Sequence, residues 1–447
     1  MAVSTLFLLP RNWLQSFLIL LFTPIVADAC PELRYLYPSS DSEWSEQLGP
    51  IEELFDQCLE SSEYFALLGA AQLNTGNLER AIESLERSLL LNPDNGAALI
   101  DYGTALFEDG QLFAALEIVS LLLERDDMPE GLEEQVIERQ KRWQALTRQT
   151  FLQLDLGGGF DNNLNGGPND SEIALTLSGE PIFLSLNEEF RSAAGKFFNA
   201  GLASRHIRLT PSSQHLFSGL IRGRLSENRA SDVVQFTGRY NNLSDRRRTV
   251  WRQGVGFSHL SFSGKALFTG LDLRQRLEFP SDSSSCSRYL GGALQHQTWH
   301  SQRRLDGIEV KVGIGGSCNL GTTREQAFTG EVNYIKNLSV NNDRLGGDRD
   351  GWQFLGQWQR MLGSGLVSAQ AEIGFLLDRN GYSRLLDNNS RRRVSRHSLL
   401  LQYRYPARAF GNEFDFLLNL FHQDQKSNIN LFESVDTSIE LGLSFSF

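Results

Sequence analysis

The sequence predicts a short helical repeat domain followed by a transmembrane antiparallel β-barrel of 14 strands, with 16 strands as the alternative. Three observations lead to this fold class. The last ten residues alternate strictly between apolar and small or polar positions, the apolar ones being Ile439, Leu441, Leu443, Phe445 and Phe447. Small residues recur at a spacing of 34 near the N-terminus, and the second half is rich in short alternating segments.

Residues 1–29 have the order of a secretory signal peptide. Arg11 precedes an apolar stretch through Leu18–Phe22, and Ala27-Asp28-Ala29 forms a small-x-small cleavage site before Cys30. A cysteine directly after the cut can instead be lipidated, but the charged Asp28 fits that alternative poorly. Either way, we expect the chain to leave the cytosol.

The four cysteines are disulfide candidates in an exported protein. Cys30 and Cys58 precede the helical region, whereas Cys286 and Cys318 lie in Ser- and Gly-rich stretches of the second half. We therefore expect one bond within each half. The alternative is four unpaired buried thiols.

Charge divides the chain into two parts. Residues 1–150 hold 9 Lys and Arg against 25 Asp and Glu, whereas residues 151–447 hold 33 against 29. The first part is strongly acidic and the second slightly basic, so the two parts are built for different surroundings.

The acidic part, residues 30–149, contains two repeats. Gly69 and Gly103, Gly76 and Gly110, and Ala81 and Ala115 are each 34 residues apart. With Leu68-Gly69, Ala81 and Pro93, the first unit resembles the tetratricopeptide repeat family. The second unit has Asp127 where that family has proline, so we expect residues 129–148 to form a capping helix, and residues 50–59 are a candidate cap at the other end.

The resemblance to tetratricopeptide repeats leaves two roles open. The repeats are either a structural spacer or a groove that binds peptides through helix side chains such as Asn74, Phe107 and Glu108. A groove in so acidic a domain favours basic partners.

Residues 150–447 are predicted to form the outer-membrane barrel. Clean alternation occurs at residues 152–156, at Ile173, Leu175 and Leu177, and at residues 414–418. About fifteen candidate strands can be counted. The first strand must begin and the last strand must end on the periplasmic side, so the number should be even. The tight turn Gly363-Ser364-Gly365 is expected on the periplasmic side. This places outer loops at 338–350, 379–393 and 423–436.

No residue pattern predicts catalysis, a cofactor or a metal site. His296 and His300 are four apart on a predicted strand, roughly 13 Å between their Cβ atoms, which is too far for one ion. Asp161-Asn162-Asn163 and Asp387-Asn388-Asn389 fit turns better than calcium sites. We interpret the glycine clusters 157–159 and 313–316 as barrel bends or lumen clearance.

Two arginine runs are candidates for binding anions. Arg246–Arg248 and Arg391–Arg393 are expected either on outer loops, where they meet lipopolysaccharide phosphates, or in the lumen, where they set anion preference.

The tail from Lys426 to Glu433, leading into Leu441-Gly442-Leu443-Ser444-Phe445-Ser446-Phe447, is similar to the closing hairpin of the surface lipoprotein assembly modifier family, which is grouped with type XI secretion. The resemblance implies an outer-membrane translocator of a Gram-negative bacterium, with its repeats in the periplasm, that moves lipoproteins or small secreted proteins to the cell surface. Its expected partners are that client, the outer-membrane lipids, and the barrel-assembly machinery, which would read Leu441, Leu443, Phe445 and Phe447. No nucleic-acid partner is expected.

Two other functions compete with translocation. Exopolysaccharide export porins also join periplasmic repeats to a terminal barrel, although their repeat arrays are usually longer, and a sugar polymer favours aromatic and acidic lumen residues. A passive solute porin, with the repeats as a spacer, is the other alternative.

Overall fold

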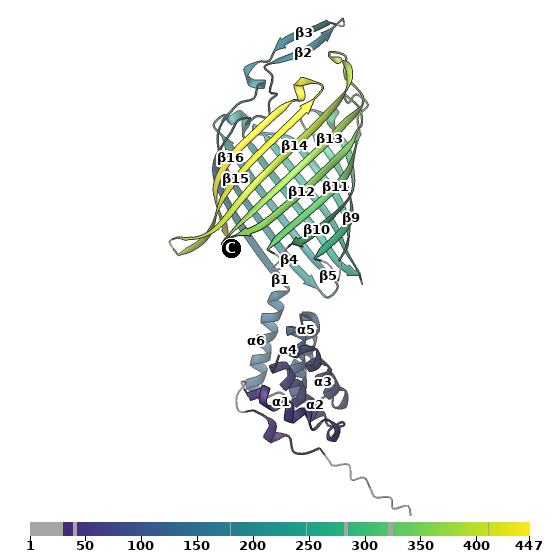
Figure 1. The fold of residues 1–447 in the computed structure, drawn as a ribbon, viewed down its shortest axis with the longest axis vertical. Helices are drawn as coiled ribbons and strands as arrows, with labels where there is room; N and C mark the ends of the chain where they lie inside the picture. The colour runs from purple at the N-terminus through teal and green to yellow at the C-terminus, as the bar shows by residue number, and fades with distance from the viewer. Residues whose placement is uncertain are drawn as a thin grey trace, which may run out of the picture. The chain divides into compact units, whose positions relative to one another are not determined.

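The computed structural model describes residues 30–38, 43–178, 180–246, 248–280, 285–320, 325–409 and 411–447. The predicted signal peptide, residues 1–29, lies outside them. The chain divides into two compact units, Met1–Trp143 and Gln144–Phe447, which are drawn in Figure 1. Among the described residues, no helix has both the length and the apolar character needed to cross a membrane.

The first unit is helical. Two helix pairs, α2 with α3 and α4 with α5, correspond to the two predicted repeats, and α6 is the predicted capping helix. The helices are α1 (Trp44–Glu52), α2 (Ser62–Asn74), α3 (Leu78–Leu91), α4 (Gly96–Glu108), α5 (Leu112–Leu123) and α6 (Glu130–Leu146). At the other end, the predicted cap at 50–59 begins earlier than expected, because α1 starts at Trp44 and carries Pro50 in its last turn.

The repeat spacing has local physical causes. Ser61 and Asn95, 34 residues apart, cap α2 and α4 by accepting hydrogen bonds from the backbone N–H groups of Tyr64 and Ala98. A Cβ at Gly69 would lie 2.5 Å from Cγ of Leu85, so glycine permits the close approach of α2 and α3. The repeat therefore encodes both a helix start and a helix contact.

A disulfide between Cys30 and Cys58 joins the N-terminal segment to the start of the repeats. It lies beside a core that includes Leu36, Ile51 and Tyr64, and the Tyr64 hydroxyl donates a 3.0 Å hydrogen bond to the Ile51 carbonyl. The predicted pairing in this half is confirmed.

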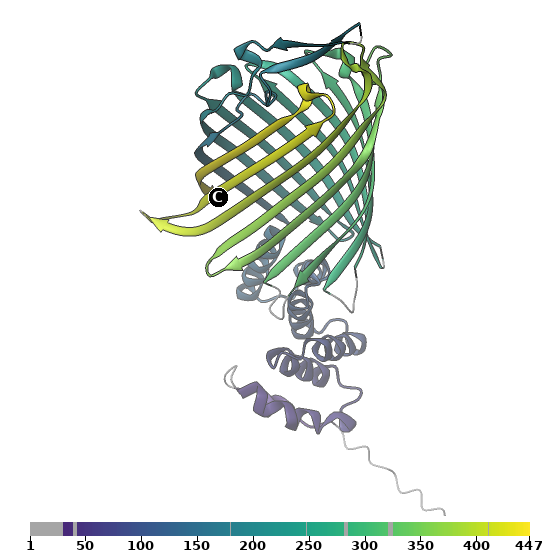
Figure 2. The same cartoon turned by 45° about the horizontal axis from the view of Figure 1, so that its top comes forward.

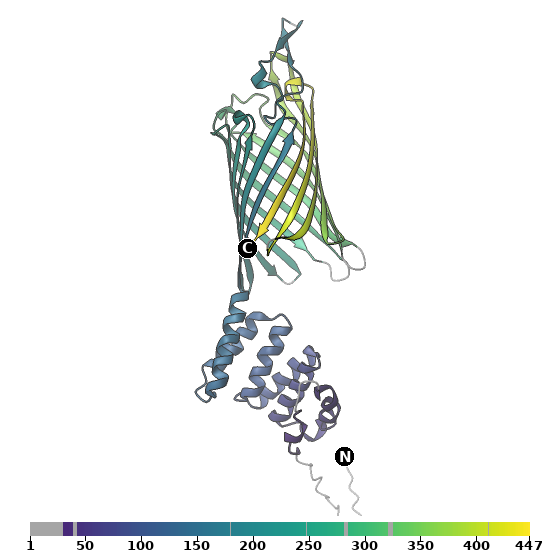
Figure 3. The ribbon, with the colours of Figure 1, turned by 90° about the vertical axis from the view of Figure 1, so that its left-hand side faces the viewer.

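The second unit is a closed antiparallel barrel of 14 strands. Neighbouring strands follow chain order, and β1 closes the ring by pairing with β16, a contact visible in Figure 3. The barrel strands are β1 (Arg148–Asp161), β4 (Gly195–Thr210), β5 (Ser213–Ser226), β6 (Val233–Arg246), β7 (Thr249–Phe262), β8 (Lys265–Phe279), β9 (Cys286–Trp299), β10 (Gly307–Leu320), β11 (Gln326–Ser339), β12 (Arg349–Leu362), β13 (Gly365–Ser383), β14 (Leu386–Ala409), β15 (Asn412–Ser427) and β16 (Ser434–Ser446).

The count of 14 membrane strands is confirmed, but one predicted membrane strand is wrong. The alternating residues Ile173, Leu175 and Leu177 form β2 (Glu172–Leu177), which pairs only with β3 (Glu180–Ser185) in a separate two-stranded sheet. This hairpin belongs to the connection between β1 and β4 (Figure 2). Alternation alone cannot distinguish a membrane strand from a short hairpin in a loop.

The two ends of the barrel differ. We call the end that carries the 363–364 turn and Phe447 the turn end, and the opposite end the loop end. The predicted outer-loop regions all lie at the loop end, although 379–393 is mostly an extension of β13 and β14 with only Arg384 and Leu385 between them. At the turn end, Cys286 and Cys318 pair directly across β9 and β10 and form the second predicted disulfide.

Candidate functional site

The alternation of each strand creates an apolar outer wall and a polar lumen. On β10, Val312 and Ile314 are exposed on the outer face, whereas Glu309 and Lys311 face the lumen. Aromatic pairs such as Tyr334 with Trp352 lie on the outer face. Trp358 shares that face, six residues further along β12. The barrel is therefore built like an outer-membrane protein.

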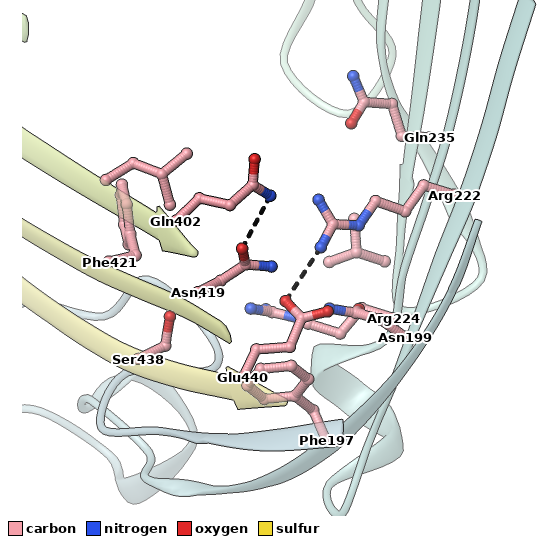
Figure 4. A pocket seen from close by; sticks show the side chains of 12 residues that line it. Phe197, Asn199, Arg222, Arg224, Gln235, Gln402, Asn419, Phe421, Ser438 and Glu440 are labelled. Carbon is pink, nitrogen blue, oxygen red and sulfur yellow. Dashed lines mark hydrogen bonds and ion pairs between the residues drawn. The ribbon is translucent and has the colours of Figure 1, made fainter. Parts of the chain in front are cut away.

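A cavity of about 450 Å³ lies in the lumen beside the closing strand (Figure 4). Nη2 of Arg222 on β5 lies 3.2 Å from Oε2 of Glu440 on β16, so this ion pair spans the inner face of β1 and β4. Nη1 of Arg224 lies 3.0 Å from Oδ2 of the buried Asp161. These contacts fasten both sides of the closing junction to β5.

A second lumenal cavity, of about 580 Å³, is lined by charges that are largely paired. Arg274 contacts Asp272 at 2.6 Å and Arg252 contacts Glu278 at 3.1 Å. Each pair joins a cation and a carboxylate within the wall. The lumen is thus polar throughout this region, with its positive charges mostly neutralised locally.

The junction between β1 and β16, which we call the seam, has a short ladder. It pairs nine positions, Gln153–Asp161 with Ser438–Ser446, whereas β1 and β4 pair 14. Glycines make the close approach possible: a Cβ at Gly442 would lie 2.8 Å from the Leu156 carbonyl oxygen. On the inner face of β1, a Cβ at Gly159 would lie 2.7 Å from the Phe197 ring. Of the predicted cluster at 157–159, Gly157 and Gly159 have such close contacts, and a Cβ at Gly158 would make only an ordinary one at 3.5 Å.

The predicted assembly-signal residues Leu441, Leu443, Phe445 and Phe447 alternate along the outer face of the seam. Leu441 is 64% exposed and Phe447 is 75% exposed. Backbone N–H and carbonyl groups of Phe447 exchange hydrogen bonds of 2.8 and 3.0 Å with those of Leu152. Their recognition by assembly machinery stays a prediction.

The consecutive arginines of each run do not share one location. Arg246 ends β6 at the turn end, the end opposite to the predicted outer-loop regions. In the second run only Arg392 turns inward, where its Nε lies 3.1 Å from Oδ2 of Asp378, a carboxylate that also contacts Arg349. Because a strand alternates, consecutive arginines cannot all face one side.

The loop end carries a network that holds the β2–β3 hairpin. The N–H of Thr176 donates a 2.9 Å hydrogen bond to the Leu385 carbonyl, and the N–H of Asn388 donates to the Thr176 hydroxyl at 3.3 Å. Asp387, Asn388 and Asn389 have φ values of 47°, 50° and 61°, the left-handed turn conformation that Asx residues tolerate. On β3, Phe183 is 64% exposed.

The predicted groove residues of the repeats have different surroundings. The Phe107 ring stacks on Trp143 of α6, with 4.5 Å between ring centroids, so the capping helix covers it. Glu108 and Asn74 are exposed, and the Asn74 amide donates a 2.8 Å hydrogen bond to the Ala70 carbonyl within its own helix. Phe107 is therefore part of the packing of α6, and peptide binding by the other two residues stays a prediction.

Asp101 on α4 is an acid that sequence reasoning missed. Burial raises its pKa to about 6, although the positive charge of Arg139 lowers it in part. The Arg139 side chain donates a 2.9 Å hydrogen bond from Nη1 to the Thr104 hydroxyl. An acid placed one turn from the helix start gives no distinctive sequence signal, because its burial depends on the packing of α6 and the N-terminal segment.

The lumenal arginines were also missed. They occur singly, at alternate positions of strands far apart in sequence, as with Arg222, Arg239 and Arg274. Their common orientation appears only when the register of each strand is known. A search for basic residues at lumen-parity positions is the signal that would have found them.

Comparisons with known proteins give separate matches for the two units. The tetratricopeptide repeat model matches residues 72–132, and no curated protein matches the chain. Among solved structures, the chain is similar to an anion-selective porin from Comamonas acidovorans, with 12% identity, 67% of this chain and 99% of that chain covered, and a TM-score of 0.33. Pseudomonas aeruginosa OprD matches at 9% identity, with coverages of 67% and 95% and a TM-score of 0.30.

The helical unit has its own structural neighbours. The Yersinia enterocolitica type III secretion translocator chaperone SycD matches at 18% identity, covering 25% of this chain and 82% of that chain, with a TM-score of 0.23. The chain thus combines a tetratricopeptide repeat unit with a closed 14-strand barrel of the outer-membrane type.

Proposed function

We propose that the protein is an outer-membrane translocator that moves lipoproteins or small secreted proteins from the periplasm to the cell surface. The observation that carries the proposal is the joining, in one chain, of a tetratricopeptide repeat unit to a closed barrel with a polar lumen. A polar passage lowers the cost of moving backbone and charged groups across the hydrocarbon layer. The repeat unit would receive the client before passage.

The lengths of the connections support an orientation in the membrane. Short turns such as residues 363–364 lie at the turn end, and β1 also begins there at Arg148. Outer-membrane barrels place their short turns in the periplasm. We therefore place the repeat unit in the periplasm and the β2–β3 hairpin on the cell surface of a Gram-negative bacterium.

The seam provides an exit route for a client. Its nine-position ladder is shorter than that between β1 and β4, and the paired glycines Gly157 and Gly442 offer no side-chain packing there. A client hairpin would pair transiently with β1 or β16 by strand addition, gaining main-chain hydrogen bonds while it crosses. The Arg222–Glu440 ion pair, which spans the seam, would have to open at the same time.

Deletion of the gene tests the proposal. We expect surface lipoproteins or secreted proteins of the deletion strain to accumulate in the periplasm, protected from protease added to whole cells. Complementation with the full chain should restore exposure. Unchanged protease accessibility of all surface lipoproteins, together with an unchanged set of secreted proteins, would refute the proposal.

A passive solute porin is the second candidate, because the cavities of the lumen show that it is not filled by side chains. Both cavities are lined by arginines together with aromatic and acidic residues, so their lining does not separate a solute porin from a polysaccharide porin. Conductance in planar bilayers separates the candidates: a large, constant open pore supports passive diffusion, and a mostly closed pore supports translocation.

A further inference from the structure

A third lumenal cavity, of about 710 Å³, lies at the turn end of the barrel. Its lining comes from β1, β4, β5, β6, β14 and β16. Three arginines are the only lining residues with charged side chains: Arg205 on β4, Arg239 on β6 and Arg404 on β14. This cavity therefore differs from the two described above, each of which is lined by both cations and carboxylates.

Strand register brings two of these arginines together. Arg205 pairs with Ser218 of β5, and Ser218 pairs in turn with Arg239. Residues in one such row share a face, and with two strand spacings between them their Cα atoms lie roughly 10 Å apart. The neighbouring Phe217 is exposed on the outer face, which places the row in the lumen. Two long guanidinium side chains at this separation can reach one anion.

Neither Arg205 nor Arg239 forms an ion pair in the described part of the chain, although Arg239 also lines the second cavity, together with Asp272. Arg222, Arg252 and Arg274 each contact a carboxylate at 3.2 Å or less. Across the described part of the chain, no carboxylate lies within 4.0 Å of the Arg205 or Arg239 guanidinium, and both side chains are exposed to the lumen.

The third arginine of the cavity is weakly paired. Nη1 of Arg404 lies 3.6 Å from Oδ2 of Asp415. Asp155, on the same side of β1, accepts a 2.8 Å hydrogen bond from the Gln153 amide. Like charges gathered in a recess of restricted dielectric repel one another, and an anion relieves that repulsion.

We propose that this cavity is an anion-binding station for phosphate or carboxylate groups that enter the lumen from the turn end. Guanidinium groups bind such oxyanions in a bidentate manner, and the hydroxyls of Ser218 and Thr237 supply further donors. The proposal deepens the proposed function, on which it rests for the statement that substrates pass through the lumen. It assigns to that passage a preference for anionic substrates.

Phosphate binding to the full chain in detergent tests the site directly. Isothermal titration with inorganic phosphate should show binding that is at least about tenfold weaker after combined Arg205→Gln, Arg239→Gln and Arg404→Gln, because several charge-assisted hydrogen bonds are lost. A matched control replaces Arg208, Arg288 and Arg360 by glutamine, since these arginines lie on the outer face and are exposed. The control should bind like the wild-type protein. Heat-modifiable migration in gels shows that each variant is folded.

Reversal potentials in planar bilayers under a KCl gradient give a second readout. The wild-type protein should favour anions, and the lumenal triple variant should lose that preference while the outer-face variant keeps it. Competition by an aspartate-rich peptide in the phosphate titration shows whether carboxylates carried on a chain share the site with free anions. The proposal is overturned if wild-type protein does not bind phosphate, or if both triple variants weaken binding equally. If the purified protein binds phosphate but the deletion strain shows no transport defect, the proposed function is contradicted and the anion site is not.

Discussion

The helical unit and the barrel differ in where they place their apolar side chains: the helical unit has them in its interior, and the barrel has them on its outer face. In the helical unit, Leu67 and Leu85 are fully buried. In the barrel, Ile314 is 63% and Leu441 is 64% exposed, and polar groups occupy the interior. The hydrophobic effect acts in both units, but the second is built for a lipid surrounding in which an outward leucine has left water.

The location of charged groups also differs between the two units. Acidic groups of the helical unit such as Glu108 lie on its surface, and Asp101 is a half-buried exception with a raised pKa. In the barrel, buried Asp378 is held by Arg349 and Arg392 inside the wall. A carboxylate away from water needs positively charged partners. Asp378 has two arginines, whereas Asp101 is influenced by only one, Arg139.

The largest expected effect comes from truncating a leucine of the helical core. Leu67→Ala should lower the free energy of unfolding of the helical unit by about 2–5 kcal/mol, because it leaves a cavity. Leu294→Ala on the outer face of β9 creates no internal cavity, so the barrel should lose much less. Helical circular dichroism and heat-modifiable migration in gels follow the two units in the full chain. Equal losses at both positions would break the comparison.

A charge on the outer face tests the lipid surrounding. Leu294 is 45% exposed, and its neighbour Gln295 faces the lumen. Leu294→Arg should destabilise the folded barrel by about 2–4 kcal/mol if it lies near the bilayer midplane. Gln295→Arg, with the same added charge, should be nearly neutral. Urea unfolding from lipid vesicles measures both, and a tolerated Leu294→Arg would argue against membrane residence of this face.

The pH dependence of the helical unit tests the buried acid. Because burial raises the pKa of Asp101 from 3.8 to about 6, the folded unit binds the proton more tightly than the unfolded chain. Its contribution to stability is therefore present at low pH and is lost as the pH rises from about 4 to about 6, a change of at most about 3 kcal/mol. Asp101→Asn should be more stable than wild type at neutral pH, with the difference vanishing below pH 4. Parallel unfolding curves at all pH values would contradict this.

Helix packing gives the smallest expected effect. Gly69→Ala should cost about 1–3 kcal/mol, because the new Cβ overlaps Leu85. Gly131→Ala in the first turn of α6 is the matched control, since nothing lies within 4 Å of a Cβ there, and alanine should stabilise that helix by about 0.5–1 kcal/mol. Thermal unfolding distinguishes the opposite signs.

The parts of the fold that were predictable from sequence are those with local signals. The spacing of 34 located both helix pairs, and alternation located the closing strand. The even strand number came from the general architecture of outer-membrane barrels, since the alternating segments alone numbered about fifteen. Alternation misassigned Ile173–Leu177, because a six-residue hairpin strand has the same pattern as part of a membrane strand. Sequence distance was enough to pair the cysteines within each half.

The site was less predictable because it depends on register. The consecutive arginines 391–393 were predicted to act together, on an outer loop or in the lumen, yet only Arg392 faces inward. Arg205 and Arg239 stand alone in sequence and meet only because Ser218 pairs with both. Phe107 was expected in a groove but packs against Trp143, a contact that depends on where α6 folds back. Non-local contacts of this kind carry no mark in either segment alone.

A reversible lock on the seam tests most directly the claim that clients leave through it. Leu152 and Phe447 exchange two hydrogen bonds, so the next pair, Gln153 with Ser446, is a non-hydrogen-bonded pair suited to a disulfide. The same alternation makes Ala203 with Leu220, on β4 and β5, a matched control. Paired cysteine substitutions at each position give one lock across the seam and one within the wall.

The measurement is the protease accessibility of surface lipoproteins in cells that carry either lock, before and after a reductant is added. We predict that the Gln153→Cys and Ser446→Cys lock lowers exposure to the level of the deletion strain and that reduction restores it. The Ala203→Cys and Leu220→Cys control should leave exposure unchanged in both states. Undiminished exposure with a fully formed seam disulfide would contradict the account.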